Sequence, residues 1–253
     1  MRKIRIGSPL QASIMFRMHE GIPEVILALD VESKERARGM LKACGDRLRW
    51  VKVGLQTYLR DGPDFVREIS DSGKSVFLDL KLHDIPNTMA KAIESLASLP
   101  IGMLTLHASA GPDALHGCAR IAREAMPETT LLAVTVLTSM DQDALASIGI
   151  ASPVEEQVNR LATLAAESGV GGIVCSPLEL PRLRTILSSE TKLVTPGIRP
   201  AGSAVGDQKR IMTPSQAKDA GADYLVIGRP ILADDNPQSA LELILKELGP
   251  SPS

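Results

Sequence analysis

Aromatic residues are scarce in this chain of 253 residues: they make up 2% of it, whereas hydrophobic residues as a whole make up 44%. A core of this composition has to be built from Leu, Ile, Val, Ala and Met, which suits the crowded, branched interior of a parallel sheet. The same scarcity argues against a large binding surface lined by aromatic side chains. The length fits one barrel-sized domain or two small ones.

An excess of charge of one sign is also missing, because the formal net charge is −2. The chain therefore has no basic field that would attract a polyanion, and we expect no nucleic-acid partner. A few focused cations are still enough to bind one small anionic ligand.

Cysteines and long apolar runs are equally sparse. Cys44, Cys118 and Cys175 are scattered without a CxxC pair, so the sequence predicts neither a disulfide framework nor a thiolate zinc site, and a reducing cytosol is the expected compartment. The apolar stretches near the basic N-terminus are too short for a signal-peptide core or a membrane span. The four histidines lack metal-binding spacing, and we expect no metal or other cofactor.

Eight short runs rich in Val, Ile and Leu alternate with stretches of helical pattern. Their successive starts are 20 to 41 residues apart, and each interval accommodates a strand, a loop, a helix and a return. This rhythm predicts an α/β fold, a (β/α)8 TIM barrel, with an open doubly wound sheet as the alternative. The runs begin at Val25, Trp50, Val76, Met103, Leu131, Gly172, Lys192 and Asp223.

The same pattern predicts a single catalytic domain. We expect the barrel over residues 23–248, an N-terminal extension over residues 1–22 and a loose C-terminal tail over residues 249–253. Residues 213–216, Thr-Pro-Ser-Gln, combine a capping box with proline at the first helical position, and they predict the start of the helix before the last strand.

The third run leads into a segment rich in ionisable side chains. Residues two apart in a strand point to the same face, so Asp79 and Lys81 are expected to project together while the intervening leucines face the helices. Asp84 follows where Pro86 indicates that the strand has ended. Its carboxylate therefore belongs to the loop at the carboxyl end of the strand, where barrel enzymes place their chemistry.

Neighbouring strands contribute further charges. Asp30 follows the first run and Lys52 lies in the second. Asp79 with Lys81 alone is compatible with a structural ion pair, but five ionisable groups from three adjacent strands are costly to desolvate without a ligand. The pattern favours a functional site.

The ends of the last two runs have the features of a phosphate site. The seventh run leads to Arg199 and then into a loop with Gly and Ser that reaches Gln208, and the eighth leads to Gly228 and Arg229. In barrels, the loops after these two strands often bind phosphate through backbone N–H groups. Arg229 adds a planar guanidinium that can donate two hydrogen bonds to the anion.

The run FLDLKLHDIPNT over residues 77–88 resembles the signature of orotidine 5'-phosphate decarboxylases, particularly of their bacterial branch. The resemblance continues from Val25 to Leu232 and includes VTVLTS, TPGIRP and DYLVIGRPI. It implies the decarboxylation of orotidine 5'-phosphate to UMP and CO2, the last step of de novo pyrimidine nucleotide synthesis, without a cofactor.

Residue by residue, the resemblance implies that Lys81 is the proton donor in a charge network with Lys52, Asp79 and Asp84. It also implies that Asp84 and Thr88 reach into the neighbouring subunit's site, so that the chain forms a homodimer with shared active sites.

The resemblance also implies the contacts to the substrate. Asp30 and Lys52 are expected to contact the ribose hydroxyls, Thr138 to face the pyrimidine, and Asp79 to meet the substrate carboxylate. The phosphate end is assigned to Arg199, Gln208, Gly228 and Arg229.

Two alternatives are left at this point. A magnesium-dependent sugar-phosphate decarboxylase of the same superfamily is similar in its Asp-x-Lys-x-x-Asp core, but the HDIPNT continuation and the TPGIRP loop favour the nucleotide enzyme. A non-catalytic nucleotide-phosphate-binding barrel would use the charges only to hold a ligand. Such a binder has no need for a proton donor placed among carboxylates.

Overall fold

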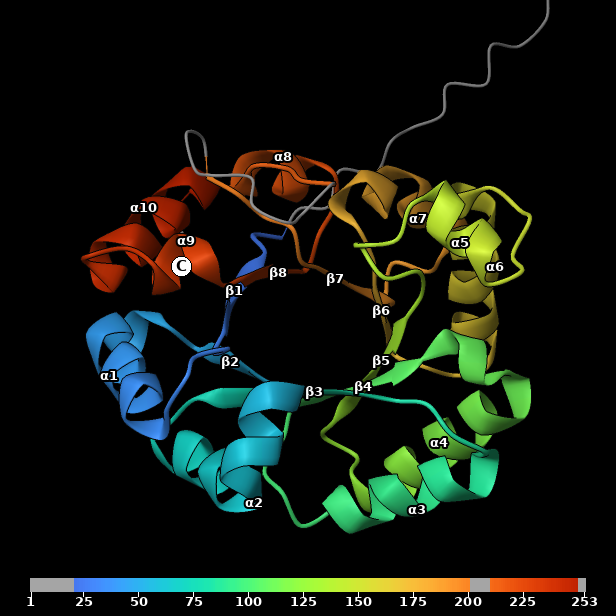
Figure 1. The fold of residues 1–253 in the computed structure, drawn as a ribbon, viewed down its shortest axis with the longest axis horizontal. Helices are drawn as coiled ribbons and strands as arrows, with labels where there is room; N and C mark the ends of the chain where they lie inside the picture. The colour runs from blue at the N-terminus through green and yellow to red at the C-terminus, as the bar shows by residue number, and fades with distance from the viewer. Residues whose placement is uncertain (1–20, 201–209, 250–253) are drawn as a thin grey trace, which may run out of the picture.

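The computed structural model describes residues 21–200 and 210–249. Within these residues, eight parallel strands close into a barrel in chain order, with β8 paired to β1. Figure 1 looks into the barrel and shows the helices as a ring around it. The strands are β1 Glu24–Ala28, β2 Trp50–Gly54, β3 Ser75–Leu82, β4 Met103–His107, β5 Thr130–Val134, β6 Gly172–Val174, β7 Lys192–Thr195 and β8 Tyr224–Ile227.

The closed barrel confirms the predicted (β/α)8 architecture, and the doubly wound alternative is wrong. Every strand begins within one residue of its predicted start. Residues 1–20 and 250–253, which make up most of the expected extension and tail, lie outside the described residues.

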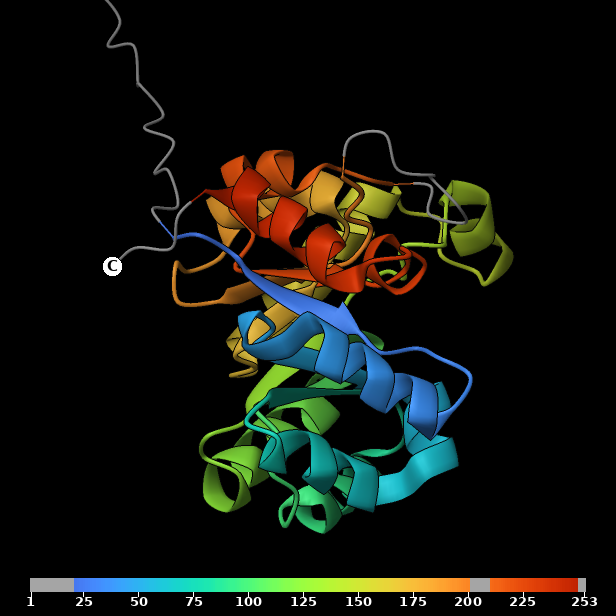
Figure 2. The same cartoon turned by 90° about the vertical axis from the view of Figure 1, so that its left-hand side faces the viewer.

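The helices cover the outer face of the barrel, and Figure 2 shows α1 and α10 on either side of β1. The α-helices of the described residues are α1 Lys34–Cys44, α2 Leu55–Asp71, α3 Pro86–Leu96, α4 Pro112–Ala125, α5 Gln142–Ser147, α6 Val154–Glu167, α7 Leu180–Ile186, α8 Pro214–Asp219, α9 Arg229–Leu232 and α10 Pro237–Leu248. Short 3₁₀ turns form η1 Gly45–Arg47, η2 Ala108–Ala110 and η3 Pro177–Glu179. None of the helices in this part of the chain combines the length and the apolar character needed to span a membrane.

Helix α8 begins as the sequence predicts. Thr213 accepts a hydrogen bond from the backbone N–H of Gln216, and the Gln216 side chain accepts one from the backbone N–H of Thr213. This reciprocal pair satisfies two N–H groups that the first helical turn leaves without partners.

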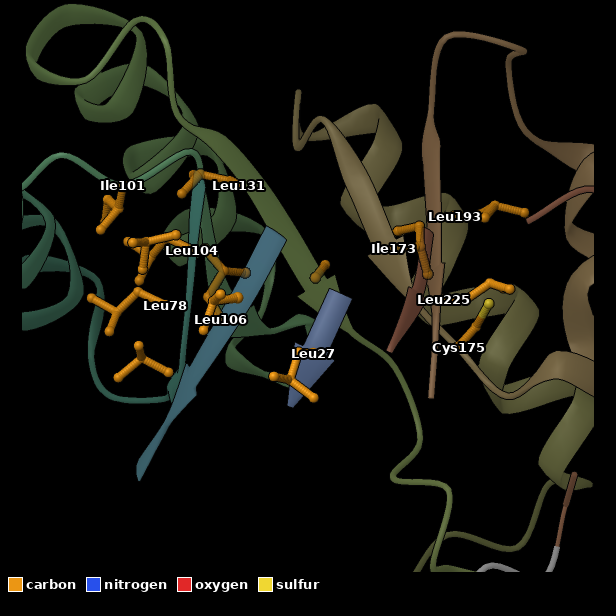
Figure 3. Close-up of a cluster of buried hydrophobic side chains, with 14 of the residues drawn as sticks. Leu27, Leu78, Ile101, Leu104, Leu106, Leu131, Ile173, Cys175, Leu193 and Leu225 are labelled. Atoms are coloured by element: carbon orange, nitrogen blue, oxygen red, sulfur yellow. The ribbon is translucent and has the colours of Figure 1, made fainter. Parts of the chain in front are cut away.

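The core has two layers, one on each face of the strands. The outer layer packs strand side chains against the helices, and Figure 3 shows Leu78, Leu104 and Leu131, which are paired across β3, β4 and β5. Each such buried leucine contributes roughly 1.5–3 kcal/mol to stability. The inner layer fills the barrel and includes Trp50 and Phe77.

The inner face of the strands changes in character along the barrel axis. On β2, Trp50 is followed two residues later by Lys52, and on β3 Phe77 is followed by Asp79 and Lys81. Because residues two apart share a face, the apolar plug at the amino ends of the strands gives way to charged groups at the carboxyl ends. The barrel thereby presents its charges at one mouth.

Candidate active site

Four side chains with alternating charge form a continuous chain at the mouth. The Lys52 ammonium lies 3.2 and 3.1 Å from the two carboxylate oxygens of Asp30. The same Nζ is 3.4 Å from Oδ2 of Asp79. Lys81 Nζ is 2.7 Å from each Asp79 oxygen. Strands β1, β2 and β3 are adjacent, so parallel neighbours bring together residues that are far apart in the sequence.

Asp79 is the centre of this network and is buried. Its Oδ1 also accepts a hydrogen bond of 2.9 Å from the hydroxyl of Thr105 on β4. Burial alone would raise the pKa of Asp79, but the ammonium groups of Lys52 and Lys81 and the hydrogen bonds from Lys81 and Thr105 bring it below its ordinary value. Asp79 is therefore a carboxylate, not a carboxylic acid, at neutral pH.

Lys81 has an unusual backbone for a residue in a strand, because its φ is +51°. The pairing of β3 with β4 is irregular here, because Leu78 pairs with Leu104 but Leu82 pairs with Leu106. A step of four residues along β3 therefore matches a step of two residues along β4. The Lys81 N–H donates to the hydroxyl of Thr105 at 2.9 Å. A positive φ at a non-glycine residue costs about 1–3 kcal/mol, and such strain collects at functional sites.

Gly54, the last residue of β2, leaves room for the network. A Cβ at this position would lie 2.8 Å from both Asp30 Oδ1 and Lys52 Nζ. Both distances are shorter than real Cβ contacts, so a side chain here would require the charged ends of Asp30 and Lys52 to shift.

The network forms one side of a cavity of about 200 Å³. Its other side is apolar and comes from the ends of β5, β6, β7 and β8. The volume is smaller than the roughly 300–1,000 Å³ of typical small-molecule sites and fits one small ring. The lining residues are Lys52, Phe77, Asp79, Lys81, Val134, Val136, Leu137, Thr138, Val174, Pro196 and Val226.

Asp84 and Thr88 lie outside this cavity lining. Both are exposed, Asp84 in the loop after β3 and Thr88 in α3. Asp84 Oδ1 accepts a hydrogen bond from the backbone N–H of Ile85 at 2.7 Å, and the Ile85 side chain is 66% exposed. The described chain thus places these two polar residues next to an exposed apolar one.

The residues expected at the phosphate end follow the strands that close the cavity. Arg199 is buried four residues after the end of β7, and its Nη1 donates to the Ile198 carbonyl at 2.8 Å. Gly228 follows β8, and Arg229 begins α9 with an exposed side chain. Gln208 lies outside the described residues.

Two histidines lie near the network. The rings of His83 and His107 are 5.3 Å apart. Burial, with His83 and Lys81 nearby, lowers the pKa of His107 and keeps its imidazole neutral at physiological pH. Among the described residues, no three His, Cys, Asp or Glu side chains are grouped so that they could hold a metal ion.

The profile of a family described as the orotidine 5'-phosphate decarboxylase / HUMPS family matches residues 23–244. The chain belongs to this family. The orotidine 5'-phosphate decarboxylase of Opitutus terrae is 50% identical to it over 225 residues, which are 89% of the chain and 98% of that relative. The orotidine 5'-phosphate decarboxylase of Psychromonas ingrahamii is 48% identical over 223 residues, which are 88% of the chain and 95% of that relative.

A solved structure agrees with this membership of the decarboxylase family. The crystal structure of orotidine 5'-phosphate decarboxylase from Lactobacillus acidophilus aligns with a TM-score of 0.81 at 36% identity, covering 90% of this chain and 100% of that one. The resemblance that the sequence motifs indicated is thereby confirmed.

Sequence reasoning missed two residues that shape the charge network of this family member. Thr105 bridges Asp79 and the Lys81 backbone, and alternation along β4 was a usable signal, because Met103 two residues earlier lies in the inner core layer. Gly54 had no such signal, because only the three-dimensional distances show what a side chain there would meet.

Proposed function

We propose that the chain decarboxylates orotidine 5'-phosphate to UMP and CO2 in the cavity at the barrel mouth. The observation that carries the proposal is the network of Asp30, Lys52, Asp79 and Lys81 along one side of an otherwise apolar cavity, in a chain of the orotidine 5'-phosphate decarboxylase / HUMPS family. The reaction is that of a carboxy-lyase in pyrimidine nucleotide synthesis.

The chemical step needs a cation beside C6 of the pyrimidine. The bond between C6 and the carboxylate carbon breaks, CO2 leaves, and the electron pair stays at C6 in the plane of the ring, where no conjugated system accepts it. The Lys81 ammonium stabilises this charge and then donates its proton to C6, and solvent returns a proton to Nζ. Asp79 holds the ammonium from 2.7 Å.

Asp79 has a second part in the proposal. A substrate carboxylate that enters beside Lys81 meets Asp79 as a like charge, and this repulsion is relieved when CO2 leaves. Binding energy from distant parts of the substrate has to offset that cost.

The remaining side chains provide this distant binding. Asp30 and Lys52 bind the ribose hydroxyls, and Thr138 faces the pyrimidine from the opposite wall of the cavity. The phosphate lies beyond the ends of β7 and β8. The residues proposed to hold it are Arg199, Gln208, Gly228 and Arg229.

We propose further that the active enzyme is a homodimer. Asp84 and Thr88 are exposed beside Ile85, which is 66% exposed, so polar and apolar side chains suited to an interface lie together after β3. In the dimer, Asp84 reaches the partner's Lys81, and Thr88 reaches the partner's substrate.

Mixing two inactive variants tests this sharing of sites. A heterodimer of a Lys81→Ala subunit and an Asp84→Ala subunit contains one site with both native residues, so random reassociation should restore about a quarter of the wild-type sites. If the mixture stays as inactive as its components although an affinity-tagged Lys81→Ala subunit co-purifies with untagged Asp84→Ala subunits, Asp84 serves its own subunit.

The activity itself is tested with purified protein and orotidine 5'-phosphate, followed by the loss of the substrate's ultraviolet absorbance. We expect UMP and CO2 in equal amounts, and full activity in excess EDTA, because the proposed step uses no metal or other cofactor. Activity that depends on added magnesium would favour a sugar-phosphate decarboxylase mechanism. Binding without turnover would favour the non-catalytic barrel.

A cytosolic location is part of the proposal and rests on three unpaired, buried cysteines.

A further inference from the structure

An ion pair outside the charge network lies beside the segments that lead to the opposite wall of the cavity. Arg210 Nη1 pairs with Oε1 of Glu179, the last residue of η3. The two side chains are only 17% and 8% exposed. The second Glu179 oxygen accepts a hydrogen bond from the backbone N–H of Ser176 at 2.8 Å. The pair therefore holds Arg210 against the segment that follows β6.

The Arg210 guanidinium also reaches the segment that follows β5. Its Nη2 donates to the Leu137 carbonyl at 3.3 Å. Leu137 and the next residue, Thr138, both line the cavity proposed to hold the pyrimidine. One planar side chain thus spans the ends of two strands, which a guanidinium can do because it donates in several fixed directions.

The backbone next to Arg210 is joined to the segment that follows β7. Met212 and Ile198 form an isolated parallel bridge, in which the Arg199 N–H donates to the Met212 carbonyl at 2.9 Å and the Met212 N–H donates to the Gly197 carbonyl at 3.4 Å. Pro196, immediately before this segment, lines the cavity. The segments that follow β5, β6 and β7 therefore meet at residues 210–212, and the first and third of them line the cavity.

We propose that Arg210 is a positioning residue: held by Glu179, it fixes the segments after β5, β6 and β7 and thereby sets how tightly the apolar wall holds the pyrimidine. The inference rests on the proposed function, because it takes the pyrimidine as the occupant of the cavity. Neither Arg210 nor Glu179 lines that cavity. The pair acts on substrate binding, and the charge network on the other side performs the chemical step.

The variant Arg210→Met removes the guanidinium and keeps the length of the side chain. We expect the KM for orotidine 5'-phosphate and the Kd for UMP to rise about tenfold, with kcat lowered less than about threefold, because uniform binding is lost and transition-state contacts are kept. Arg210→Lys should raise KM and Kd by an intermediate amount, because an ammonium keeps the positive charge but lacks the second guanidinium nitrogen that donates to the Leu137 carbonyl.

Arg182→Met is the matched control. Arg182 lines a second cavity, of about 490 Å³, together with Arg210 and Glu179, but it is exposed and its Nη1 donates to the Thr185 hydroxyl at 3.4 Å. We expect this variant to keep the wild-type KM and kcat.

An unchanged KM and Kd in Arg210→Met, with only a lower melting temperature, would give the pair a purely structural role and overturn the inference. A fall in kcat with KM unchanged would overturn it as well.

If Arg210→Met does not fold, Glu179→Gln tests the same wall. Its amide oxygen can still accept a hydrogen bond from the Ser176 N–H, but the ion pair with Arg210 is lost. A wild-type KM in Glu179→Gln would overturn the inference. If the wild-type protein does not consume orotidine 5'-phosphate, the proposed function fails, whereas UMP titrations of the wild type and Arg210→Met still report on the wall.

Discussion

Asp79 and Glu179 are both carboxylates near the barrel mouth, and each residue is only 7% exposed, yet their pKa values are shifted in opposite directions. Burial raises the pKa of both. At Asp79 this is outweighed by two ammonium groups, those of Lys52 and Lys81, and the pKa is lowered. At Glu179 one guanidinium, that of Arg210, and one backbone N–H do not outweigh burial, and the pKa is raised.

The number of cations around a buried acid, and not burial itself, decides the direction in which its pKa is shifted at this mouth. On the Asp79 side, Lys81 ends the charge network and lines the cavity, where its ammonium group can meet a substrate that develops negative charge. The Glu179 side pairs one cation with one anion and joins loops. We therefore assign the chemical step to the first side and the shape of the cavity to the second.

The largest effect that separates the two sides is expected from Lys81→Ala. Turnover should fall by roughly 10⁴-fold or more, because a positioned general acid and the electrostatic stabilisation of a carbanion are lost together. Glu179→Gln should lower kcat by less than about tenfold. Steady-state kinetics with circular dichroism as a folding control measure both; near-normal turnover in Lys81→Ala would remove this residue from the mechanism.

A smaller effect on the Asp79 side is expected from Gly54→Ala. The added methyl group would lie 2.8 Å from Asp30 Oδ1 and Lys52 Nζ, so the charged ends of both side chains must shift, and kcat/KM should fall on the order of tenfold to a hundredfold. Gly39→Ala in α1 is the control, because a Cβ there meets nothing within 4 Å. Equal kinetics in the two variants would show that the Asp30–Lys52 contact does not matter for turnover.

The smallest effect is expected in the pH dependence of the free energy of unfolding. The contributions of Asp79 and Glu179 should change with pH in opposite directions. The pKa of Asp79 is lowered from 3.8, so its contribution is complete above that pH and is lost as the pH falls through the folded-state pKa. The pKa of Glu179 is raised from 4.5, so its contribution is complete below that pH and is lost as the pH rises through the folded-state pKa.

Urea denaturation between acidic and neutral pH measures this difference. The stability advantage of the wild type over Asp79→Asn should shrink towards acidic pH, whereas its stability relative to Glu179→Gln should decrease towards neutral pH. The same slope for both variants would contradict the opposite shifts.

Local patterns were sufficient to predict much of this molecule. The period of the apolar runs located the eight strands of the described residues, and the two-residue alternation of β3 placed Asp79 and Lys81 on one face. Both signals depend only on neighbours in the sequence. Parallel pairing then brought Lys52 and Asp30 to the same mouth, as the ends of the first two runs indicated.

Contacts between distant segments could not be predicted in the same way. Glu179 and Arg210 are 31 positions apart and lie in different loops, and no periodic pattern connects them. The left-handed φ of Lys81 is equally hidden, because lysine carries no preference for that conformation and the strand pattern predicts an extended one.

The backbone at Lys81 has a consequence for how this protein can change over evolutionary time. Glycine adopts a φ of +51° without strain, so a lysine-to-glycine replacement at residue 81 relieves the strain and abolishes the proton donor in a single step. Selection for a stable fold and selection for turnover therefore act against each other at this position. A lineage freed from the need for this reaction would have a thermodynamic reason to lose Lys81 early.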